Sequence, residues 1–346
     1  MSVYYDGSKL LSKKDLNGNT PEIFICTSNR SAGKTTFFNR LVVDRYIKDK
    51  KKFGLLYRYK YELDDCADKF FKDIKGLFFP EYEMTSKSCS QGVYHKLFLN
   101  KENCGYAIAL NSADSIKKIS HYFSDIDSII FDEFQSETNN YCPNEVKKFR
   151  SIHTSIARGQ NKQVRYVPVY MISNPVSIIN PYYTSMKIAS RLTKETKFLR
   201  GNGFVLEQGY NENSANLQKE SQFNQAFEDD NYLAYSAEGV YLNDNLSFVE
   251  PPKGAMKYLA TIRYNGKDYS IKSFAKDGII YCDNKADLDF PFKISVTTED
   301  HSVNYVMLKN SEFFIMTMKY YFEKGCFRFR DLNCKEAVLK LLSAGV

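Results

Sequence analysis

The first 200 residues of this 346-residue chain predict an α/β domain with a mainly parallel sheet, and its last part predicts a smaller, β-rich α+β domain. Three observations support this fold class. Between residues 21 and 175, short apolar strand patterns alternate with helix patterns, which is typical of a parallel sheet. Residues 201–248 are polar and acidic. From residue 249 onward, alternating strand patterns meet at tight-turn signals. We therefore expect domains over 1–200 and 249–346, joined by a linker over 201–248.

Each element of the first domain follows from its own pattern. The apolar runs that predict strands are 21–27, 51–59, 96–100, 105–111, 126–134 and 164–175. Between them, residues 35–50 and 141–159 repeat apolar side chains at helical spacing. Pro143 lies near the first turn of the second helix, where proline is tolerated. Pro168 argues against a central, paired position for the last strand.

The remaining residues divide into two further patterns. Residues 201–250 are rich in Asn and Gln, and we expect them to be partly helical. The dipeptides Asn265-Gly266 and Asp277-Gly278 each stand between alternating runs and predict hairpin turns. Residues 333–345 repeat apolar side chains at helical spacing and predict a terminal helix.

The overall composition excludes several classes of protein. Hydrophobic residues make up 43% of the chain and charged residues 26%, so wholesale disorder is excluded. No apolar run reaches the roughly 18 residues of a membrane-spanning helix, and the N-terminus lacks an apolar signal segment, so we expect no membrane partner. We therefore expect the eight cysteines to stay reduced. They form no C-x-x-C pair, which indicates neither a zinc knuckle nor a redox pair.

Residues 28–35 predict a phosphate-binding loop. They match a P-loop except at its first position, where Ser28 replaces glycine. The loop joins a predicted strand to a predicted helix, so backbone N–H groups and the helix N-terminus favour phosphate there. Lys34 would reach the β- and γ-phosphates, and the Thr35 hydroxyl would bind Mg²⁺. The alternative is an ordinary strand-to-helix turn with a solvated lysine. The predicted nucleotide-binding residues are Ser28, Asn29, Arg30, Ser31, Ala32, Gly33, Lys34, Thr35 and Thr36.

The strand predicted at 126–134 carries two adjacent acids near its end, in the form of a Walker B strand. Asp132 would hold the water shell of Mg²⁺, and Glu133 would act as the general base toward the attacking water. Two exposed acids at an ordinary strand end are the alternative. Together with the P-loop, the pair predicts ATP hydrolysis. A glutamate directly after the aspartate points to the additional-strand, catalytic-glutamate type of P-loop ATPase.

Two further residues follow a predicted strand and a predicted helix. Asn174, in Ser173-Asn174-Pro175, could sense the γ-phosphate and couple its loss to motion. A plain Asn-Pro turn is the alternative. Arg158 is a candidate arginine finger supplied to a neighbouring subunit. Its alternative role is that of a cation that stabilises a helix C-terminus.

Other cations have less specific assignments. Arg30 could fold back on the γ-phosphate or on a neighbouring acid. Arg58 and Lys60, after the second predicted strand, could contact nucleotide or DNA, and a solvated surface explains them equally well. Lys117 and Lys118 are candidates for contacts between subunits.

Charge is divided unevenly along the chain. Residues 1–200 carry 32 Lys and Arg against 21 Asp and Glu, residues 201–250 carry one Lys against nine acids, and residues 251–346 carry 15 basic residues against 11 acidic ones. Basic blocks of this kind are compatible with a polyanionic partner, although unequal solvated surfaces give the same pattern.

The chain resembles the DNA-packaging motor ATPases of small protein-primed podoviruses (the Salasmaviridae type), which are relatives of the terminase large subunit. The order and spacing of the matching segments fit across residues 20–185, and a weaker match continues through 264–266. The segments are Arg-Ser-Ala-Gly-Lys-Thr at 30–35, Tyr-Lys-Tyr-Glu-Leu at 59–63, Ile-Phe-Asp-Glu-Phe at 130–134, Tyr-Cys-Pro-Asn-Glu-Val at 141–146, Ser-Asn at 173–174 and Val-Ser-Ile-Ile-Asn-Pro-Tyr at 176–182.

The resemblance implies an ATPase of the host-cell cytoplasm that pumps double-stranded DNA into a procapsid. It implies a homo-oligomeric ring, commonly of five subunits, that acts transiently at the portal vertex, and members of this type can use a packaging RNA between ring and portal. Arg158 lies where the family has its trans-acting finger. The C-terminal domain would be a ribonuclease-H-like fold that has lost nuclease activity.

The sequence departs from the family pattern at Ser28 and at Pro175, which restricts the segment after Asn174. Three readings of the function compete with packaging. The chain could be another P-loop DNA translocase or helicase, or a structural protein with a relic nucleotide site. It could also be a terminase with an active nuclease, because acids cluster in the C-terminal domain and a two-metal nuclease needs convergent carboxylates. These acids are Asp283, Asp287, Asp289 and Asp300.

Overall fold

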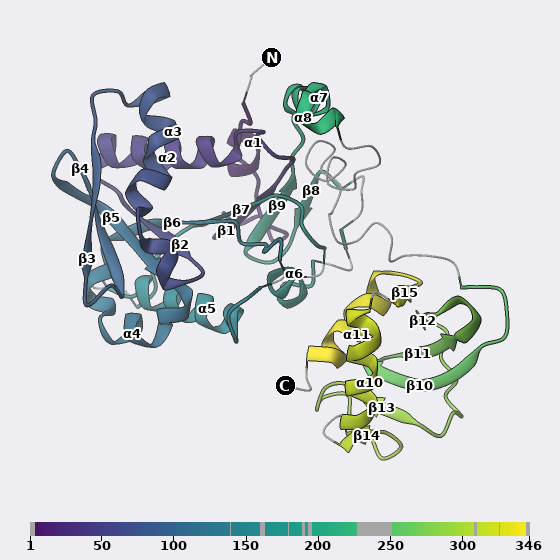
Figure 1. Cartoon of the computed structure of the whole chain (residues 1–346). Helices are drawn as coiled ribbons and strands as arrows, with labels where there is room; N and C mark the ends of the chain where they lie inside the picture. Colours follow the sequence, from purple (N-terminus) through teal and green to yellow (C-terminus); the bar gives the residue numbers. More distant parts are fainter. Residues whose placement is uncertain are drawn as a thin grey trace. The chain divides into compact units, whose positions relative to one another are not determined.

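Two units make up the computed structural model: Met1–Ser177 with Leu192–Leu242, and Ile178–Arg191 with Asn243–Val346. Figure 1 shows the chain and its elements. The residues that the structure describes are 4–138, 140–159, 163–178, 180–188, 191–192, 196–226, 251–307, 310–324 and 326–343. Most of the predicted linker, residues 227–248, lies outside them.

A nine-stranded sheet with the order β3-β4-β5-β2-β6-β7-β1-β9-β8 forms the centre of the first unit. Its six middle strands are mutually parallel, and antiparallel strands complete the two edges. This arrangement confirms the predicted α/β class. The strands are β1 (Ile23–Thr27), β2 (Lys52–Tyr57), β3 (Met84–Cys89), β4 (Tyr94–Leu99), β5 (Glu102–Ala109), β6 (Ile126–Asp132), β7 (Val169–Ser173), β8 (Phe198–Arg200) and β9 (Phe204–Gln208).

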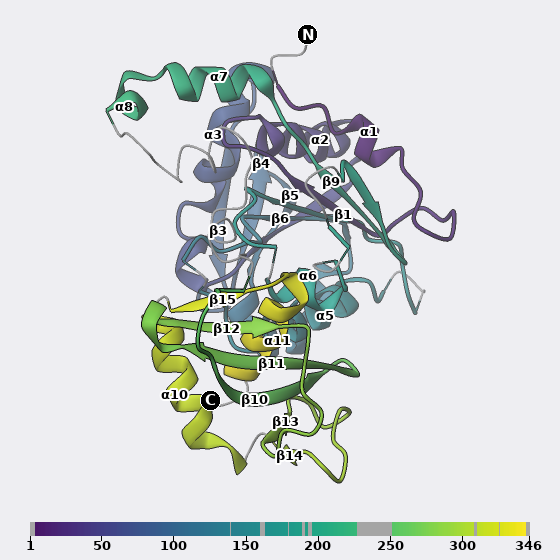
Figure 2. The ribbon, with the colours of Figure 1, turned by 90° about the vertical axis from the view of Figure 1, so that its right-hand side faces the viewer.

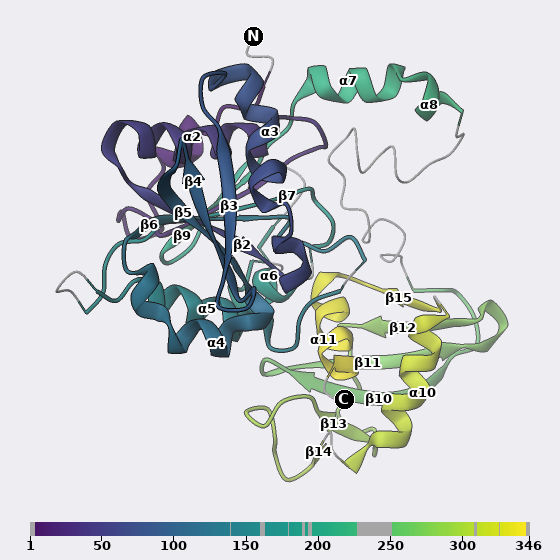
Figure 3. The ribbon, with the colours of Figure 1, turned by 60° about the vertical axis from the view of Figure 1, so that its left-hand side comes forward.

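Helices cover both faces of this sheet. The helices α2 (Lys34–Asp49) and α3 (Cys66–Phe78) lie on one face, and α4 (Ala113–Lys118) and α5 (Glu145–Ile156) lie on the other (Figure 3). The apolar sides of α2 and α3 supply core residues such as Phe38, Val42 and Phe70, which pack with β1 and β2. Further helices of this unit are α1 (Ser8–Leu11), α7 (Glu212–Glu220), α8 (Gln222–Gln225) and the 3-10 turns η1 (Lys60–Leu63), η2 (Leu110–Ser112) and η3 (Ser120–Phe123).

The structure corrects the expected position of the strand that contains Pro168. Strand β7 pairs with both β6 and β1, so it is central rather than peripheral. Pro168 stands one residue before β7, and its carbonyl accepts a hydrogen bond from the Ile129 N–H. The proline therefore removes no ladder donor from the strand itself. The sheet also continues through β9, beyond the expected domain boundary at residue 200.

A six-stranded sheet with the order β14-β13-β10-β11-β12-β15 forms the second unit (Figure 2). Asn265 and Gly266 both have positive φ and join β10 to β11, as predicted. Buried residues of α10 and α11, among them Ile315, Met318 and Val338, share one core with Ile262 and Ile271 of the sheet. A ribonuclease-H-like fold remains a prediction. The elements are β10 (Lys257–Tyr264), β11 (Lys267–Phe274), η4 (Ala275–Asp277), β12 (Ile279–Asp283), β13 (Lys293–Ser295), β14 (Val306–Met307), α10 (Glu312–Glu323), β15 (Phe327–Phe329) and α11 (Leu332–Ser343), with α6 (Pro181–Ser185) in the segment from the middle of the chain.

Candidate nucleotide site

The predicted phosphate loop runs from the end of β1 to the first turn of α2. Gly33 has φ +92°, and a Cβ added there would lie 2.9 Å from the Tyr4 side chain, so both conformation and space require glycine. Ser31 also has positive φ, whereas Ser28 is not among the described residues with this conformation. The loop therefore has its bend without a glycine at residue 28. Thr36 lies half-buried in the first turn of α2.

The ammonium group of Lys34 joins the loop to the residue that follows β7. Its Nζ donates to Asn174 Oδ1 at 2.7 Å and to the carbonyl oxygens of Ser28 and Asn29 at 3.4 and 3.5 Å. Lys34 is buried, and burial lowers the pKa of its ammonium group, while Cys26 and Asp132 oppose the shift. Lys34 and Asn174, two predicted site residues that lie 140 positions apart in the sequence, are thus in direct contact.

The hydroxyl of Thr35 donates to Asp132 Oδ2 at 2.9 Å. Burial raises the pKa of the Asp132 carboxyl, and Lys34 and the Thr35 hydroxyl act against this shift. A hydroxyl beside a carboxylate is the oxygen-donor set that suits Mg²⁺ when phosphates and water complete its shell. The pair therefore fits the predicted magnesium ligands.

Glu133 directly follows Asp132 in the chain. Its φ is +52°, a left-handed backbone conformation that is uncommon for this residue type. Its N–H donates to Asp132 Oδ1 at 2.9 Å. Desolvation raises the pKa of Glu133, and the carboxylates of Asp132 and Glu137 raise it further. The side chain lines two cavities of ≈ 310 and ≈ 250 Å³, of which the first also includes Thr35 and Asp132.

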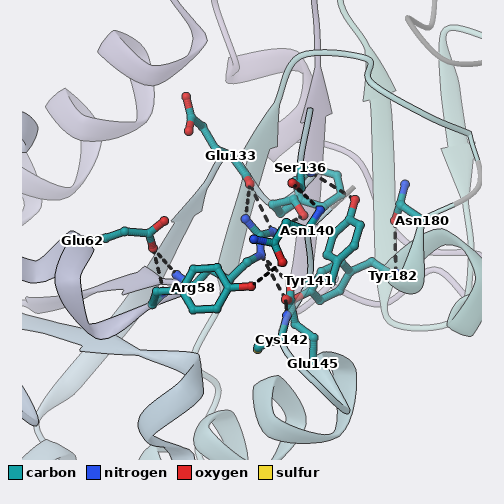
Figure 4. A network of polar contacts seen from close by, with 12 residues as sticks. Arg58, Glu62, Glu133, Ser136, Asn140, Tyr141, Cys142, Glu145, Asn180 and Tyr182 are labelled. Atoms are coloured by element: carbon teal, nitrogen blue, oxygen red, sulfur yellow. Dashed lines mark hydrogen bonds and ion pairs between the residues drawn. The ribbon is translucent and has the colours of Figure 1, made fainter. Parts of the chain in front are cut away.

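Arg58 is buried and holds the segment around Glu133 in place. Its Nε donates to Glu145 Oε1 and Oε2 at 3.2 and 3.0 Å, and its other nitrogens donate to the carbonyl oxygens of Glu133 and Phe134. Figure 4 shows the Glu133 carbonyl turned toward Arg58 and its carboxylate turned away. Glu62 in turn accepts from the Arg58 and Tyr59 N–H groups. This placement does not support the predicted DNA contact of Arg58.

Arg30 forms an ion pair with Glu137, which agrees with the alternative that Arg30 folds back on a neighbouring acid. Lys60 is exposed, and its Nζ donates to the Gln91 carbonyl at 2.8 Å. No pattern in the sequence marked Glu137 or Glu145 as partners, although Glu145 lies in the Pro-Asn-Glu-Val segment.

Two segments distant in sequence flank the phosphate loop. The Tyr5 N–H donates to the Ala32 carbonyl at 2.7 Å. Asn211 and Asn29 exchange two hydrogen bonds of 3.0 Å, N–H to Oδ1 in one direction and Nδ2 to carbonyl in the other. Asn211 Oδ1 also accepts from the Ser214 N–H and thereby caps α7. These contacts were not predictable from the sequence, because asparagine pairs leave no periodic signal.

Arg158 lies just beyond α5 and is exposed. It lines a separate open cavity of ≈ 490 Å³, together with Lys117, Lys147 and Arg150. On α5, residues 147, 150 and 154 lie on one helical face, and Arg158 continues the same spacing. Among the described residues that line this cavity, none is acidic.

The described acids of the second unit that were considered for a nuclease do not converge on one another. Asp283 is buried and pairs with Lys272 at 2.9 Å and Arg330 at 3.8 Å. Asp300 accepts from the N–H groups of Asn265 and Gly266, and Asp287 accepts from the Asp289 N–H. Among the described residues, no three His, Cys, Asp or Glu side chains are placed to hold a metal ion. Within the same residues, no helix is long and apolar enough to cross a membrane.

Comparison with known proteins gives consistent matches along the whole chain. The DNA packaging protein of Bacillus phage phi29 is 24% identical over 311 residues, which cover 89% of this chain and 87% of that protein. The DNA packaging protein of Bacillus phage B103 is 25% identical over 304 residues and covers 87% and 88%.

Two solved structures share the fold. A chain from the bacteriophage Phi-29 viral genome packaging motor assembly aligns over 100% of both chains, with TM-score 0.62 and 21% identity. The Phi-28 gp11 DNA packaging motor aligns over 98% of this chain and 97% of its own, with TM-score 0.59 and 14% identity. A family model described as the podovirus DNA encapsidation protein (Gp16) matches residues 1–344. Because this model spans nearly the entire sequence, the chain belongs to the podovirus DNA encapsidation protein (Gp16) family.

Proposed function

We propose that this protein hydrolyses ATP with Mg²⁺ and uses the cycle to move double-stranded phage DNA into a procapsid. The observation that carries the proposal is the meeting of Lys34, Thr35, Asp132, Glu133 and Asn174 at one edge of the parallel sheet. Membership in a DNA encapsidation family, with relatives named DNA packaging proteins, supports DNA as the substrate and movement into the procapsid as its direction.

The chain's own residues divide the chemistry of hydrolysis among them. Backbone N–H groups of residues 28–35 and the Lys34 ammonium bind the phosphates. Thr35 and Asp132 would hold Mg²⁺, which neutralises charge on the phosphate oxygens. Glu133 takes a proton from the attacking water, and its raised pKa makes its carboxylate a stronger base than an ordinary glutamate.

Asn174 would couple the state of the nucleotide to the rest of the chain. Lys34 donates to Asn174 at 2.7 Å, and a phosphate oxygen competes for the same ammonium group. Binding of ATP would therefore free the Asn174 amide, and release of products would restore the contact. The chain after β9 would then carry the change from the first unit to the second.

The active assembly would be a ring of identical subunits, commonly five, at the portal vertex in the host-cell cytoplasm. Arg158 of one subunit would act on the nucleotide of its neighbour. The exposure of Arg158 in a basic concave surface supports this, since a trans-acting residue has to be accessible in the single chain. A packaging RNA between ring and portal is a further partner of the same proposal.

ATP hydrolysis with and without long double-stranded DNA tests the proposal, with Glu133→Gln as the blank. We expect DNA to stimulate turnover and the variant to abolish it while still binding ATP. Packaging into purified procapsids is the next assay. Absence of turnover in the unaltered protein, even with procapsids and DNA present, would contradict the proposed function.

A further inference from the structure

Gln135 lies two residues after Glu133 and is buried, with 3% of its surface exposed. Its Oε1 accepts hydrogen bonds from the N–H groups of Val176 and Ser177, at 3.2 and 2.9 Å. Because only the oxygen of the amide can accept, these two donors fix which end of the side chain is which. The amide nitrogen therefore points away from residues 176 and 177.

That nitrogen, Gln135 Nε2, has no hydrogen-bond partner among the described residues. The same holds for the hydroxyl of Ser173, which is 2% exposed. Both residues line the ≈ 250 Å³ cavity that also contains Glu133 and Asn174. A buried polar group without a partner costs free energy, so two of them in one cavity indicate a ligand with hydrogen-bond acceptors.

We infer that Gln135 donates its amide nitrogen to an oxygen of the γ-phosphate, with Ser173 as a second donor beside it. An NH₂ group can only donate, and phosphate oxygens are strong acceptors. The water that Glu133 activates is a weaker candidate, because its lone pair has to attack phosphorus. The inference rests on the proposed function, since it assigns a new residue to the same nucleotide site.

The oxygen end of the Gln135 side chain binds the backbone close to the boundary between the two units. Val176 and Ser177 are the last residues of the first unit before the segment Ile178–Arg191, which belongs to the second unit. One amide group thus joins the position of the γ-phosphate to the backbone at the point where the chain leaves the ATPase unit. Loss of the γ-phosphate would remove the partner of Nε2 and leave the bonds of Oε1 in place. Gln135 would therefore distinguish ATP from ADP by direct contact with the γ-phosphate.

The test measures the affinities for ATP and ADP in a Glu133→Gln protein that cannot hydrolyse. Gln135→Glu keeps an oxygen for the two N–H groups and removes the donor. Gln135→Leu removes both. We expect the ATP affinity to fall at least about tenfold in each variant while the ADP affinity stays unchanged, because a hydrogen bond to a charged group is lost only with ATP. Gln222→Glu, at an exposed position of α8, adds the same charge elsewhere and controls for it.

Hydrogen exchange at the Ser177 amide without nucleotide separates the two roles of Gln135, because the Val176 N–H also donates to the Asn174 carbonyl at 3.0 Å. In the Gln135→Glu protein the Ser177 amide should exchange as slowly as in the parent, which shows that the backbone contact persists. Equal changes in ATP and ADP affinity would overturn the inference. Gln135 would then only bind the Val176 and Ser177 backbone. If the Glu133→Gln parent binds neither nucleotide, the proposed function fails and the inference fails with it.

Discussion

Glu133 is held by its neighbours in a conformation that glutamate alone would not choose. A left-handed residue other than glycine costs roughly 1–3 kcal/mol, so the surrounding contacts have to maintain it. Its N–H is bound by Asp132, and its carbonyl oxygen accepts from Arg58. With its backbone bound on both sides, Glu133 lines the cavities that also contain Thr35 and Asn174.

The pH dependence of turnover should report the raised pKa of Glu133. The ionised form is the active base, so kcat falls when the pH drops through the pKa of this residue. Since that pKa is raised, the fall should occur above the ordinary glutamate value of about 4.3. Initial rates at saturating ATP between pH 4.5 and 8 measure it. A decline that begins only at or below the ordinary value would exclude Glu133 as the titrating base.

Removal of one partner from the buried Arg58–Glu145 pair should destabilise the first unit. Glu145→Gln leaves the guanidinium buried without its counter-charge, which costs about 3–5 kcal/mol. The free energy of unfolding in urea measures the loss. Glu102→Gln breaks the exposed pair with Lys50 and serves as the control, with an expected change of at most about 1 kcal/mol. Equal effects of the two substitutions would contradict the role assigned to Arg58.

At the scale of elements, sequence patterns predict those features that depend on a short segment of the chain alone. The predicted phosphate loop and the acidic end of β6 are each a short segment with its own signal. Their meeting through Thr35 and Asp132 follows from parallel strands, whose carboxyl ends share one edge. Strand β3 and the Asn29–Asn211 exchange were not predictable, since edge pairing and contacts 182 residues apart depend on tertiary packing.

The end of helix α5 should act on a neighbouring subunit rather than on its own. Arg158→Ala and Lys34→Ala subunits would each be inactive in a uniform ring. In mixed rings, an Arg158→Ala subunit keeps its own phosphate loop and receives an intact arginine from a Lys34→Ala neighbour. We therefore expect a mixture to regain part of the DNA-stimulated ATPase activity.

The measurement is turnover across mixing ratios, with ATP binding by the Arg158→Ala protein as the folding control. Activity that stays at the level of the separate variants at every ratio would place Arg158 in its own site or outside catalysis. Unchanged turnover by a uniform Arg158→Ala ring would refute the assignment directly.

At the scale of the whole molecule, the presence of a mainly parallel sheet and of a separate, smaller β-rich part was predictable from the change in pattern along the chain. The boundary itself was less so, because β9 at Phe204–Gln208 pairs in parallel with β1 and extends the first sheet. The position of Pro168 shows the limit of a single-residue rule. One residue separates a proline that would break a central strand from one that precedes it.

The net positive charge of the chain predicts how it holds DNA. The chain carries a net charge of +7, concentrated in its first 200 residues, and a motor that accepts any sequence has to hold phosphates rather than bases. Affinity for double-stranded DNA should then fall linearly with salt on logarithmic axes. If one subunit holds about five phosphates, the affinity falls by two to three orders of magnitude from 50 to 200 mM salt.

Fluorescence anisotropy with two unrelated duplexes measures both the salt dependence of the affinity and its independence of DNA sequence. Lys60→Gln should lower the slope by about one if this exposed lysine touches a phosphate. Salt-independent binding, or strong preference for one duplex, would be incompatible with a backbone grip and would require base contacts in its place.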